Sequence, residues 1–342
     1  MSRSLFIPVL LMLVACTGRA APAPVERADI AEAPIQRCVN LSNALEAPVE
    51  GEWGYVIEDQ HIQLIADIGF DTVRLPVKWS AYTGHAPDFE ISPDLLARVD
   101  HVLDQAFQAN LNVVLDVHHF DALYSDPGGE FARLEAIWRQ LSAHYANAPD
   151  QLIFELINEP RDQIQVEDMP AINSALLSIV RQKHPDRWVV LGSAEWGSLG
   201  GWLDADWPTD DNRLMTTFHY YEPYELTHEG ASFLDDPPSF GPEWGSRDSH
   251  IKTLAAHFSE ATEKAAHDGL PVLVGEFGVY RGVSMTERAS WVRAVREQSE
   301  AAGFAWCHWG FASAFQAWDP QRETWHEEII AALGLSLPLR GR

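Results

Sequence analysis

The sequence has few positively charged residues for its size. Of its 342 residues, 24 are Lys or Arg and 50 are Asp or Glu, which gives a net charge of −26 at pH 7. An acidic surface of this kind repels phosphate backbones, so we expect no nucleic-acid partner. The hydrophobic share of 46% and the charged share of 22% exclude a disordered chain and predict a packed core. A neutral ligand remains compatible with such a surface.

Long apolar runs are also missing, apart from one near the start. Residues 5–14 form an apolar run that follows a single early cation, Arg3, and is too short to span a bilayer. Such a run is typical of a secretory signal peptide. The stretch LVAC (13–16) resembles the lipobox of bacterial lipoprotein signals. An isolated cysteine in an ordinary signal peptide is the alternative.

The lipobox resemblance implies where the protein works. It implies removal of a signal peptide at 1–15 and a lipid anchor on Cys16, so we expect an exported protein held on a bacterial membrane. Thr17, which is not an acidic residue, resembles signals sorted to the outer membrane, with either the cell surface or the periplasm as the facing compartment. Residues 16–34 are rich in Ala and Pro without an apolar period, which predicts a tether.

Cysteine is scarce, with three residues in the chain. Beyond Cys16 there remain Cys38 and Cys307, and an oxidising compartment would permit a bridge between them. Both fall on strands predicted to be interior, and buried free cysteine packs as a small hydrophobic residue. We therefore favour two buried thiols over a disulfide.

The chain lacks a glycine-rich phosphate turn and any internal repeat. Its turn after the first apolar run reads NLSNALEAP, without G-x-G-x-x-G, which argues against a doubly wound open sheet that binds a dinucleotide. Helical-period stretches at 58–69, 92–110 and 284–303 separate short, mostly β-branched or aromatic runs. We predict a single α/β domain over 35–342, a (β/α)₈ TIM barrel. Its strands are expected within 35–41, 71–76, 111–117, 151–157, 187–193, 213–219, 271–277 and 303–309.

Polar or aromatic residues follow nearly every predicted strand. Barrel enzymes carry out their chemistry at the carboxyl ends of the strands, where these side chains would gather. Chance would leave several of those ends apolar. The residues are Asn43, Glu46, Arg74, His118, His119, Asn158, Glu159, Glu195, Trp196, His219, Tyr221, Glu276 and Trp309.

Two of these residues are carboxylates with informative surroundings. Glu159 lies in LINEP directly after an apolar strand, and Glu276 lies in VGEFG between glycines that let a ligand approach closely. Two carboxyl groups that face each other across a cleft are what glycoside hydrolysis requires, one as proton donor and one as nucleophile. Either glutamate alone would more often be a solvated loop residue, so the hypothesis depends on their combination.

Neighbouring residues supply the groups that separate the two pKa values. Arg74 is expected to keep Glu276 charged, and Tyr221 to donate a hydrogen bond to the same carboxylate. His219 is expected to orient Glu159, and Asn158 to bind the 2-hydroxyl of a sugar. A zinc site is the alternative for the histidines, but the first strand lacks the H-x-H that a metal-dependent barrel hydrolase would usually carry. We expect no metal and no cofactor.

These residues resemble those of a known family, glycoside hydrolase family 5. The likeness runs from about residue 38 to 333, and the segments NEP (158–160) and GEFG (275–278) fit its two catalytic signatures. The resemblance implies a retaining barrel enzyme with Glu159 as acid/base and Glu276 as nucleophile. The residues that match the family's shared set are Arg74, His118, Asn158, Glu159, His219, Tyr221, Glu276 and Trp309.

Further segments resemble the bacterial branch of broad β-1,4-glucan and mannan endohydrolases, among them NALEAP (43–48), EGEWG (50–54), SAEWG (193–197) and EWGS (243–246). The resemblance implies that Asn43, His118, His119 and Trp244 line sugar subsites. We add Trp196 and Trp309 as substrate-binding residues because aromatic rings stack on sugar faces, and Glu46 because it follows the first predicted strand. The chain departs from the pattern at Ser42, where the family usually has Gly, and at Gly310, where similar enzymes can carry Glu. The second departure affects sugar preference, without touching the catalytic residues.

The expected function is therefore endo-hydrolysis of a β-1,4-glucan with net retention, with the two carboxyl groups ~5–5.5 Å apart. An endo-β-1,4-mannanase or glucomannanase would use the same residues, as would a transglycosylase. A non-catalytic glycan-binding surface lipoprotein is the alternative from another class, and the retained pair of glutamates argues against it. We expect a monomer whose partners are a β-linked polysaccharide or oligosaccharide and, through Cys16, a membrane.

Overall fold

The computed structural model describes residues 33–337, except 209, 240, 242 and 246. The predicted signal peptide, the anchor residue Cys16 and nearly all of the predicted tether lie outside these residues. The domain boundary predicted at residue 35 falls just before the first strand, which begins at Arg37.

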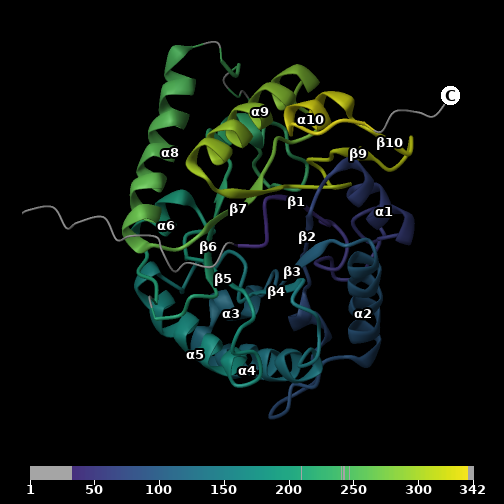
Figure 1. The fold of residues 1–342 in the computed structure, drawn as a ribbon, viewed down its shortest axis with the longest axis vertical. Coiled ribbons are helices and arrows are strands. Elements are labelled where there is room, and N and C mark those ends of the chain that lie inside the picture. Colours follow the sequence, from purple (N-terminus) through teal and green to yellow (C-terminus); the bar gives the residue numbers. More distant parts are fainter. Residues whose placement is uncertain (1–32, 209, 240, 242, 246, 338–342) are drawn as a thin grey trace, which may run out of the picture.

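Eight parallel strands close into a barrel in which each strand pairs with the next along the chain and the last pairs with the first. Figure 1 shows the strands at the centre, surrounded by helices. This closure confirms the predicted (β/α)₈ barrel and excludes the open sheet. The strands are β1 (Arg37–Asn40), β2 (Thr72–Leu75), β3 (Asn112–Asp116), β4 (Leu152–Glu155), β5 (Val189–Leu191), β6 (Leu214–Tyr220), β7 (Val272–Phe277) and β8 (Ala305–His308).

The helices between the strands begin and end where local sequence signals place them. Helix α1 (Asp59–Ile68) stops at Gly69 and α9 (Met285–Ala302) at Gly303, both with left-handed backbone, and the Ser284 side chain accepts a hydrogen bond from the first turn of α9. In the described part of the chain, no helix is both long enough and apolar enough to cross a bilayer. The helices are α1 (Asp59–Ile68), α2 (Pro93–Gln108), α3 (Asp121–Ser125), α4 (Pro127–His144), α5 (Met169–Arg181), α6 (Leu199–Asp204), α7 (Tyr224–Thr227), α8 (Asp248–Asp268), α9 (Met285–Ala302) and α10 (Glu327–Ala332). The smaller elements are the 3₁₀ turns η1 (Trp79–Tyr82) and η2 (Val166–Asp168) and the two-stranded ribbon of β9 (Trp318–Asp319) and β10 (Thr324–Trp325).

Alternation along the strands divides the buried residues into two apolar groups. Val39, Val73 and Phe154 belong to the large core between the barrel and its helices. A smaller core fills the barrel interior. Side chains alternate along a strand. The residues two positions after these core residues therefore also face the interior, one layer closer to the carboxyl end of the barrel. The members of the inner core on the strands are Cys38, Val114, Ile153, Val190, Met215, Leu273, Ala305 and Cys307.

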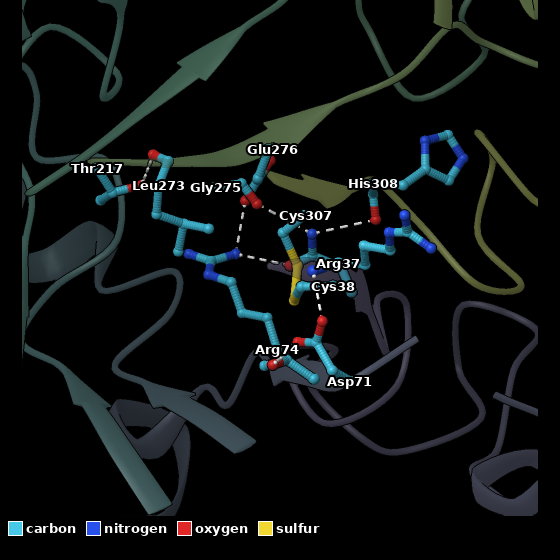
Figure 2. Close-up of a disulfide and its surroundings, with 12 residues drawn as sticks. Arg37, Cys38, Asp71, Arg74, Thr217, Leu273, Gly275, Glu276, Cys307 and His308 are labelled. Carbon is cyan, nitrogen blue, oxygen red and sulfur yellow. Dashed lines mark hydrogen bonds and ion pairs between the residues drawn. A yellow bond between two sulfur atoms is a disulfide. The ribbon is translucent and has the colours of Figure 1, made fainter. Parts of the chain in front are cut away.

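The inner core contains a disulfide between Cys38 and Cys307, so our prediction of two free thiols is wrong (Figure 2). The cysteines are 269 residues apart in sequence, but barrel closure pairs β1 with β8 in a register that sets them directly opposite each other, with Cα atoms 4.1 Å apart. Their spacing along the chain carried no sign of this register. The bond joins the first and last strands of the barrel.

Candidate active site

The predicted catalytic residues converge at the carboxyl end of the barrel. Arg74 lies on β2, His219 on β6 and Glu276 on β7, while Glu159 follows β4 and Trp309 follows β8. Arg74 is fully buried, Glu276 is 4% exposed and the side chain of Glu159 is 17% exposed. The two carboxyl groups therefore lie in a largely desolvated site, with Glu159 on the more open side.

Glu276 faces the barrel interior because β7 contains a bulge. The register shifts by one residue at Gly275 against both β6 and β8, so that Gly275 and Glu276 follow each other on the inner side. Val274 and Phe277, on either side of the bulge, pack in the outer core. Only glycine fits at the bulge, since a Cβ there would lie 2.5 Å from the Thr217 hydroxyl oxygen.

Hydrogen-bond donors surround the Glu276 carboxylate. Arg74 Nη1 lies 2.8 Å from Glu276 Oε1, and the Tyr221 hydroxyl donates to Oε2 at 2.9 Å. His219 Nδ1 is 3.7 Å from Oε2. A carboxylate with a buried guanidinium and a phenol as partners is stabilised in its charged form.

Glu159 has a different environment. Its Oε1 lies 2.7 Å from His219 Nδ1, and its backbone carbonyl accepts a hydrogen bond from Arg161 at 3.2 Å. Burial lowers the pKa of His219, which favours the neutral ring. A neutral ring can accept a hydrogen bond from the protonated carboxyl group of Glu159. The structure thus places His219 in contact with the carboxyl group that it was predicted to orient.

Burial raises the pKa of both glutamates to about 7. One carboxylate oxygen of Glu159 lies within 4.8 Å of one of Glu276, and two like charges at this separation oppose each other's ionisation. Arg74 and Tyr221 bind Glu276 directly and lower its pKa, whereas Arg161 and Arg74 lower the pKa of Glu159 without contacting its carboxyl oxygens, as far as the described residues show. The direct contact favours the charged form of Glu276, which leaves Glu159 as the better candidate for the proton donor.

Arg74 is held by polar residues that the sequence pattern did not lead us to expect. Its Nε and Nη2 bind the two oxygens of Glu155 at 2.7 and 2.8 Å, and Nη2 also lies 2.8 Å from Asp116. Nη1 donates to the side-chain oxygen of Asn40 at 3.0 Å. A signal was present in the sequence, because Asp116 and Glu155 are charged residues inside otherwise apolar strand runs and such residues need a buried partner.

His118 links this network to the predicted sugar-binding side of the site. Its Nδ1 lies 2.8 Å from Asp116 Oδ2 and its Nε2 lies 3.3 Å from Asn158 Nδ2. The ring is parallel to that of Trp309, with 5.7 Å between centroids. Burial lowers the pKa of His118 well below its usual value, so it is a neutral, fixed polar group.

Two exposed aromatic rings lie against residues that follow the carboxyl ends of the strands. Trp196 is 57% exposed and lies under the guanidinium of Arg161, 4.1 Å from its ring centroid. Trp53, which was not among the predicted site residues, is 42% exposed and packs edge-on against His119 at 5.8 Å. Such rings offer flat apolar surfaces to a sugar. Trp196 therefore has the accessibility that its predicted platform role requires.

Three predicted substrate-binding residues, the 2% exposed His118 and two others, do not have that accessibility. Trp244 is 8% exposed and packs against His250 and Trp291 in the outer core, so it presents no free ring to a ligand. Glu46 is fully buried and its carboxyl group accepts hydrogen bonds from the backbone of Asn43 and Ala44. Burial raises its pKa to about 8. Both assignments are corrected: Trp244 is a core residue, and Glu46 shapes the loop that carries Asn43.

Left-handed backbone is concentrated at this end of the barrel. Five non-glycine residues at the strand ends have positive φ, an arrangement that costs about 1–3 kcal/mol per residue and persists where the surroundings enforce it. This concentration is typical of a functional site. The five are Asn43 (65°), His119 (50°), Glu159 (46°), Glu195 (58°) and Trp196 (61°).

Glu159, His219 and Glu276 have donor atoms close enough together to consider a metal ion. The contact of 2.7 Å between His219 and Glu159 would have to open to admit a cation, and Arg74 already places a positive charge 2.8 Å from Glu276. The arrangement fits proton transfer better than metal binding. A cavity of about 400 Å³ at the opposite end of the barrel, lined among others by Arg37, Glu300 and Trp306, contains none of these groups.

The raised pKa of Glu159 makes a prediction about stability. In the folded state this carboxyl group holds its proton up to about pH 7, whereas the ordinary pKa of a glutamate is 4.5, so its contribution is fully present below pH 4.5 and is lost as the pH rises through 7. We expect Glu159→Gln to raise the unfolding free energy at pH 8 by on the order of 1–3 kcal/mol and to change it little at pH 4.5. Thermal unfolding at the two pH values measures this, and an equal effect at both would contradict it.

Comparison with known proteins identifies relatives of this chain. A family model described as Cellulase (glycosyl hydrolase family 5) matches residues 34–313. Endoglucanase H of Acetivibrio thermocellus is 31% identical over 270 residues, which are 79% of this chain and 29% of that protein. This chain therefore spans less than a third of the length of that relative.

Solved structures are similar over a larger share of their length. Endoglucanase Cel5A from Thermotoga maritima superimposes with a TM-score of 0.84 and 33% identity, over 87% of this chain and 96% of that chain. A structure of the same protein in complex with mannotriose gives a TM-score of 0.85 and 32% identity, over 91% of this chain and 99% of that chain. The similarity thus covers the whole barrel.

Proposed function

Because the chain belongs to the cellulase family, glycosyl hydrolase family 5, we propose that it hydrolyses internal β-1,4 bonds of a glucan with net retention. The observation that carries this proposal is the pair Glu159 and Glu276, with carboxylate oxygens within 4.8 Å of each other in a desolvated site. Inverting enzymes keep their carboxyl groups ~6.5–9.5 Å apart to admit a water molecule, and this pair is closer than that. The two relatives are named endoglucanases, which supports cleavage within the chain.

The different environments of the two carboxyl groups suit the two steps of retention. In the first step Glu159 gives its proton to the glycosidic oxygen while the ionised Glu276 attacks the anomeric carbon, forming a covalent glycosyl-enzyme. In the second step Glu159, now ionised, takes a proton from the water that releases the sugar from Glu276. His219 is placed to hold Glu159 in both protonation states, since its Nδ1 lies 2.7 Å from the carboxyl oxygen.

Other residues are proposed to bind the sugar. Asn158 is held by Arg74 through its side-chain oxygen at 2.7 Å, which orients its amide, and we assign it the 2-hydroxyl. We assign one wall to Trp309, with the buried His118 parallel to it, the rim to Asn43 and His119, and a platform to the exposed Trp196.

A β-1,4-mannan is the second candidate substrate. The similar Thermotoga maritima protein has been solved in complex with mannotriose, and mannose differs from glucose at the 2-hydroxyl that Asn158 is proposed to bind. Reducing-end release from mixed-linkage β-glucan and from β-mannan, measured side by side with Glu276→Gln as the blank, tests both. Proton NMR of the first product tests retention, since a retaining enzyme releases the β anomer first. Release from neither polymer, or an initial α anomer, would contradict the proposal.

We also propose that Cys16 anchors the protein to a bacterial membrane, a proposal supported by the sequence pattern at 13–16 alone. We expect Cys16→Ala to move the protein from the membrane fraction to the soluble fraction after expression in a bacterial host that processes lipoproteins. Fractionation and incorporation of labelled fatty acid measure the change. An equal membrane share for both proteins would contradict the anchor.

A further inference from the structure

Asn40 stands at the carboxyl end of β1 and is fully buried, yet every polar group of its side chain has a partner. Its amide nitrogen donates to the carbonyl oxygens of Gly275 and His308 at 3.1 and 3.2 Å. Its oxygen accepts from Arg74 Nη1 at 3.0 Å. One side chain thus connects the bulge before Glu276, the last residue of β8 and the guanidinium that binds Glu276.

The contact between Asn40 and Arg74 fixes where the second hydrogen of Nη1 points. Nη1 carries two N–H groups, and its two partners are Asn40 and Glu276 Oε1, at 3.0 and 2.8 Å. The other edge of the guanidinium is occupied by Glu155. Asn158 and Asp116 lie at the second N–H of Nη2. Because the guanidinium is planar, these partners together with Asn40 turn the second N–H of Nη1 toward Glu276.

The disulfide lies directly beneath this contact. Cys38 precedes Asn40 by two residues, so both side chains face the barrel interior, and Cys307 immediately precedes His308. The bond joins register partners, Cys38 with Cys307, on the two strands that Asn40 connects through the His308 carbonyl. Figure 2 shows the disulfide beside Arg74, Gly275, Glu276 and His308.

We propose that Asn40 is a positioning residue that aims Arg74 at Glu276, and that the Cys38–Cys307 disulfide fixes the seam between β1 and β8 on which Asn40 stands. The proposal rests on the proposed function in that Glu276 is the nucleophile. Glu276 also faces other groups that set its charge. They are Tyr221 and His219 from β6 and its end, and Glu159 after β4, with Asp116 on β3 and Glu155 on β4 around Arg74.

The test compares Asn40→Ala and Asn40→Asp with Asn173→Ala. Asn173 is an equally buried asparagine on α5 whose amide donates to the Gly192 carbonyl, away from Arg74. We expect kcat to fall about tenfold to a hundredfold in both Asn40 variants with little change in KM. Asn40→Ala loses the hydrogen bond to the charged Arg74, whereas Asn40→Asp can still accept from Arg74 but loses the donor to the Gly275 and His308 carbonyls and adds a negative charge near Glu276. The acidic limb of the kcat/KM profile should move to higher pH, since a less well aimed Arg74, or an added carboxylate, disfavours ionised Glu276.

A packing role for Asn40 would give another result: lower thermal stability, as in Asn173→Ala, with the acidic limb unmoved in both Asn40 variants. That outcome would overturn the proposal. Titration of the Glu276 carboxyl carbon by ¹³C NMR, with the resonance identified by its loss in Glu276→Gln, needs no turnover. An Asn40-dependent titration in a protein without activity would support the positioning role and contradict the proposed function, so the two failures are distinguishable.

The disulfide is tested by comparing the oxidised full chain with Cys38→Ala/Cys307→Ala and with wild type refolded in dithiothreitol and checked by mass spectrometry for the two added hydrogens. The refolded protein retains both sulfur atoms and lacks only the bond. We expect both forms to show the acidic limb displaced in the same direction as in Asn40→Ala, by a smaller amount. If the acidic limb of the kcat/KM profile were unchanged in both forms while their thermal stability fell, the disulfide would have a structural role alone. That result would overturn this half of the proposal.

Discussion

Replacing Glu276 by Gln is expected to reduce kcat by on the order of 10⁴–10⁶-fold while the protein remains folded, since removal of a nucleophile in other enzymes has an effect of this size. The amide has nearly the shape of the carboxylate, so the contacts with Arg74 at 2.8 Å and Tyr221 at 2.9 Å can be partly retained. What is lost is the negative charge that attacks the anomeric carbon. Initial rates on mixed-linkage β-glucan, with thermal unfolding as the check on folding, measure the effect.

A matched control is Glu297→Gln, which makes the same chemical change on an exposed glutamate of α9 paired with Arg296. Its rate should be that of the wild type. Glu276→Ala adds a sharper test, because azide can enter the space left by the side chain and attack an activated aryl glycoside. The product should be the α-glycosyl azide if Glu276 is the nucleophile, and β-glycosyl azide would assign that role elsewhere. Binding of glycan without cleavage by the wild type would instead support the non-catalytic alternative.

Replacing Arg74 by Met is expected to lower the unfolding free energy by about 3–5 kcal/mol at pH 7.5, the usual result of removing one member of a buried ion network. Arg74 is fully buried and contacts the carboxylates of Asp116, Glu155 and Glu276 at 2.7–2.8 Å. Without the guanidinium, no other Arg and no Lys within the described part of the chain contacts these buried carboxylates. Denaturant unfolding measures the loss, and activity should fall with it because Glu276 loses its charged partner.

The pH dependence of the Arg74 effect gives this prediction a direction. Burial already raises the pKa of Asp116 to about 6 and that of Glu276 to about 7, and removing the cation raises both further. The folded variant then binds more protons than the unfolded chain in acidic solution, so its stability recovers as the pH falls toward 5. The loss should therefore be smaller at pH 5 than at pH 7.5, and an equal loss at both would contradict an electrostatic origin.

Arg98→Met is the control for the loss of an arginine. Arg98 binds Glu50 through two hydrogen bonds of 2.8 Å, but the pair is partly exposed, with side chains 26% and 19% accessible. Solvent screens such pairs, and we expect a cost of about 1 kcal/mol or less with little dependence on pH. The contrast between the two substitutions isolates the effect of burial.

The barrel, and which side chains gather at its carboxyl end, could be predicted from the order of residues alone. Strand and helix periods are local properties, and the parallel strands of a barrel are covered on both faces, so they appear as continuous apolar runs bounded by turn residues. Polar residues directly after such runs must gather at one end, because all the strands point the same way. Glu159, His219, Arg74 and Tyr221 were found by this reasoning.

The register of a strand, the burial of a side chain and its contact partners became evident only in the folded chain. Glu276 and Val274 are two residues apart on β7, so a regular strand would point both to the same side. The bulge at Gly275 turns the glutamate inward while Val274 packs outward. Trp244 and Glu46 occur in motifs that resemble sugar-binding segments, but the surrounding chain buries both. Exposure depends on contacts from distant segments, which the local sequence does not specify.

The disulfide and the contacts of Arg74 likewise could not be predicted from local sequence. Cys38 meets Cys307 only because the barrel closes with β1 and β8 in one register, across 269 residues of sequence. Asn40, Asp116 and Glu155 occur on three different strands, and their shared partner is evident only when those strands are adjacent around the interior. Local sequence specifies which groups reach the end of the barrel, and the closed fold specifies which of them touch, since a hydrogen bond or a disulfide requires atoms to meet within a few ångströms.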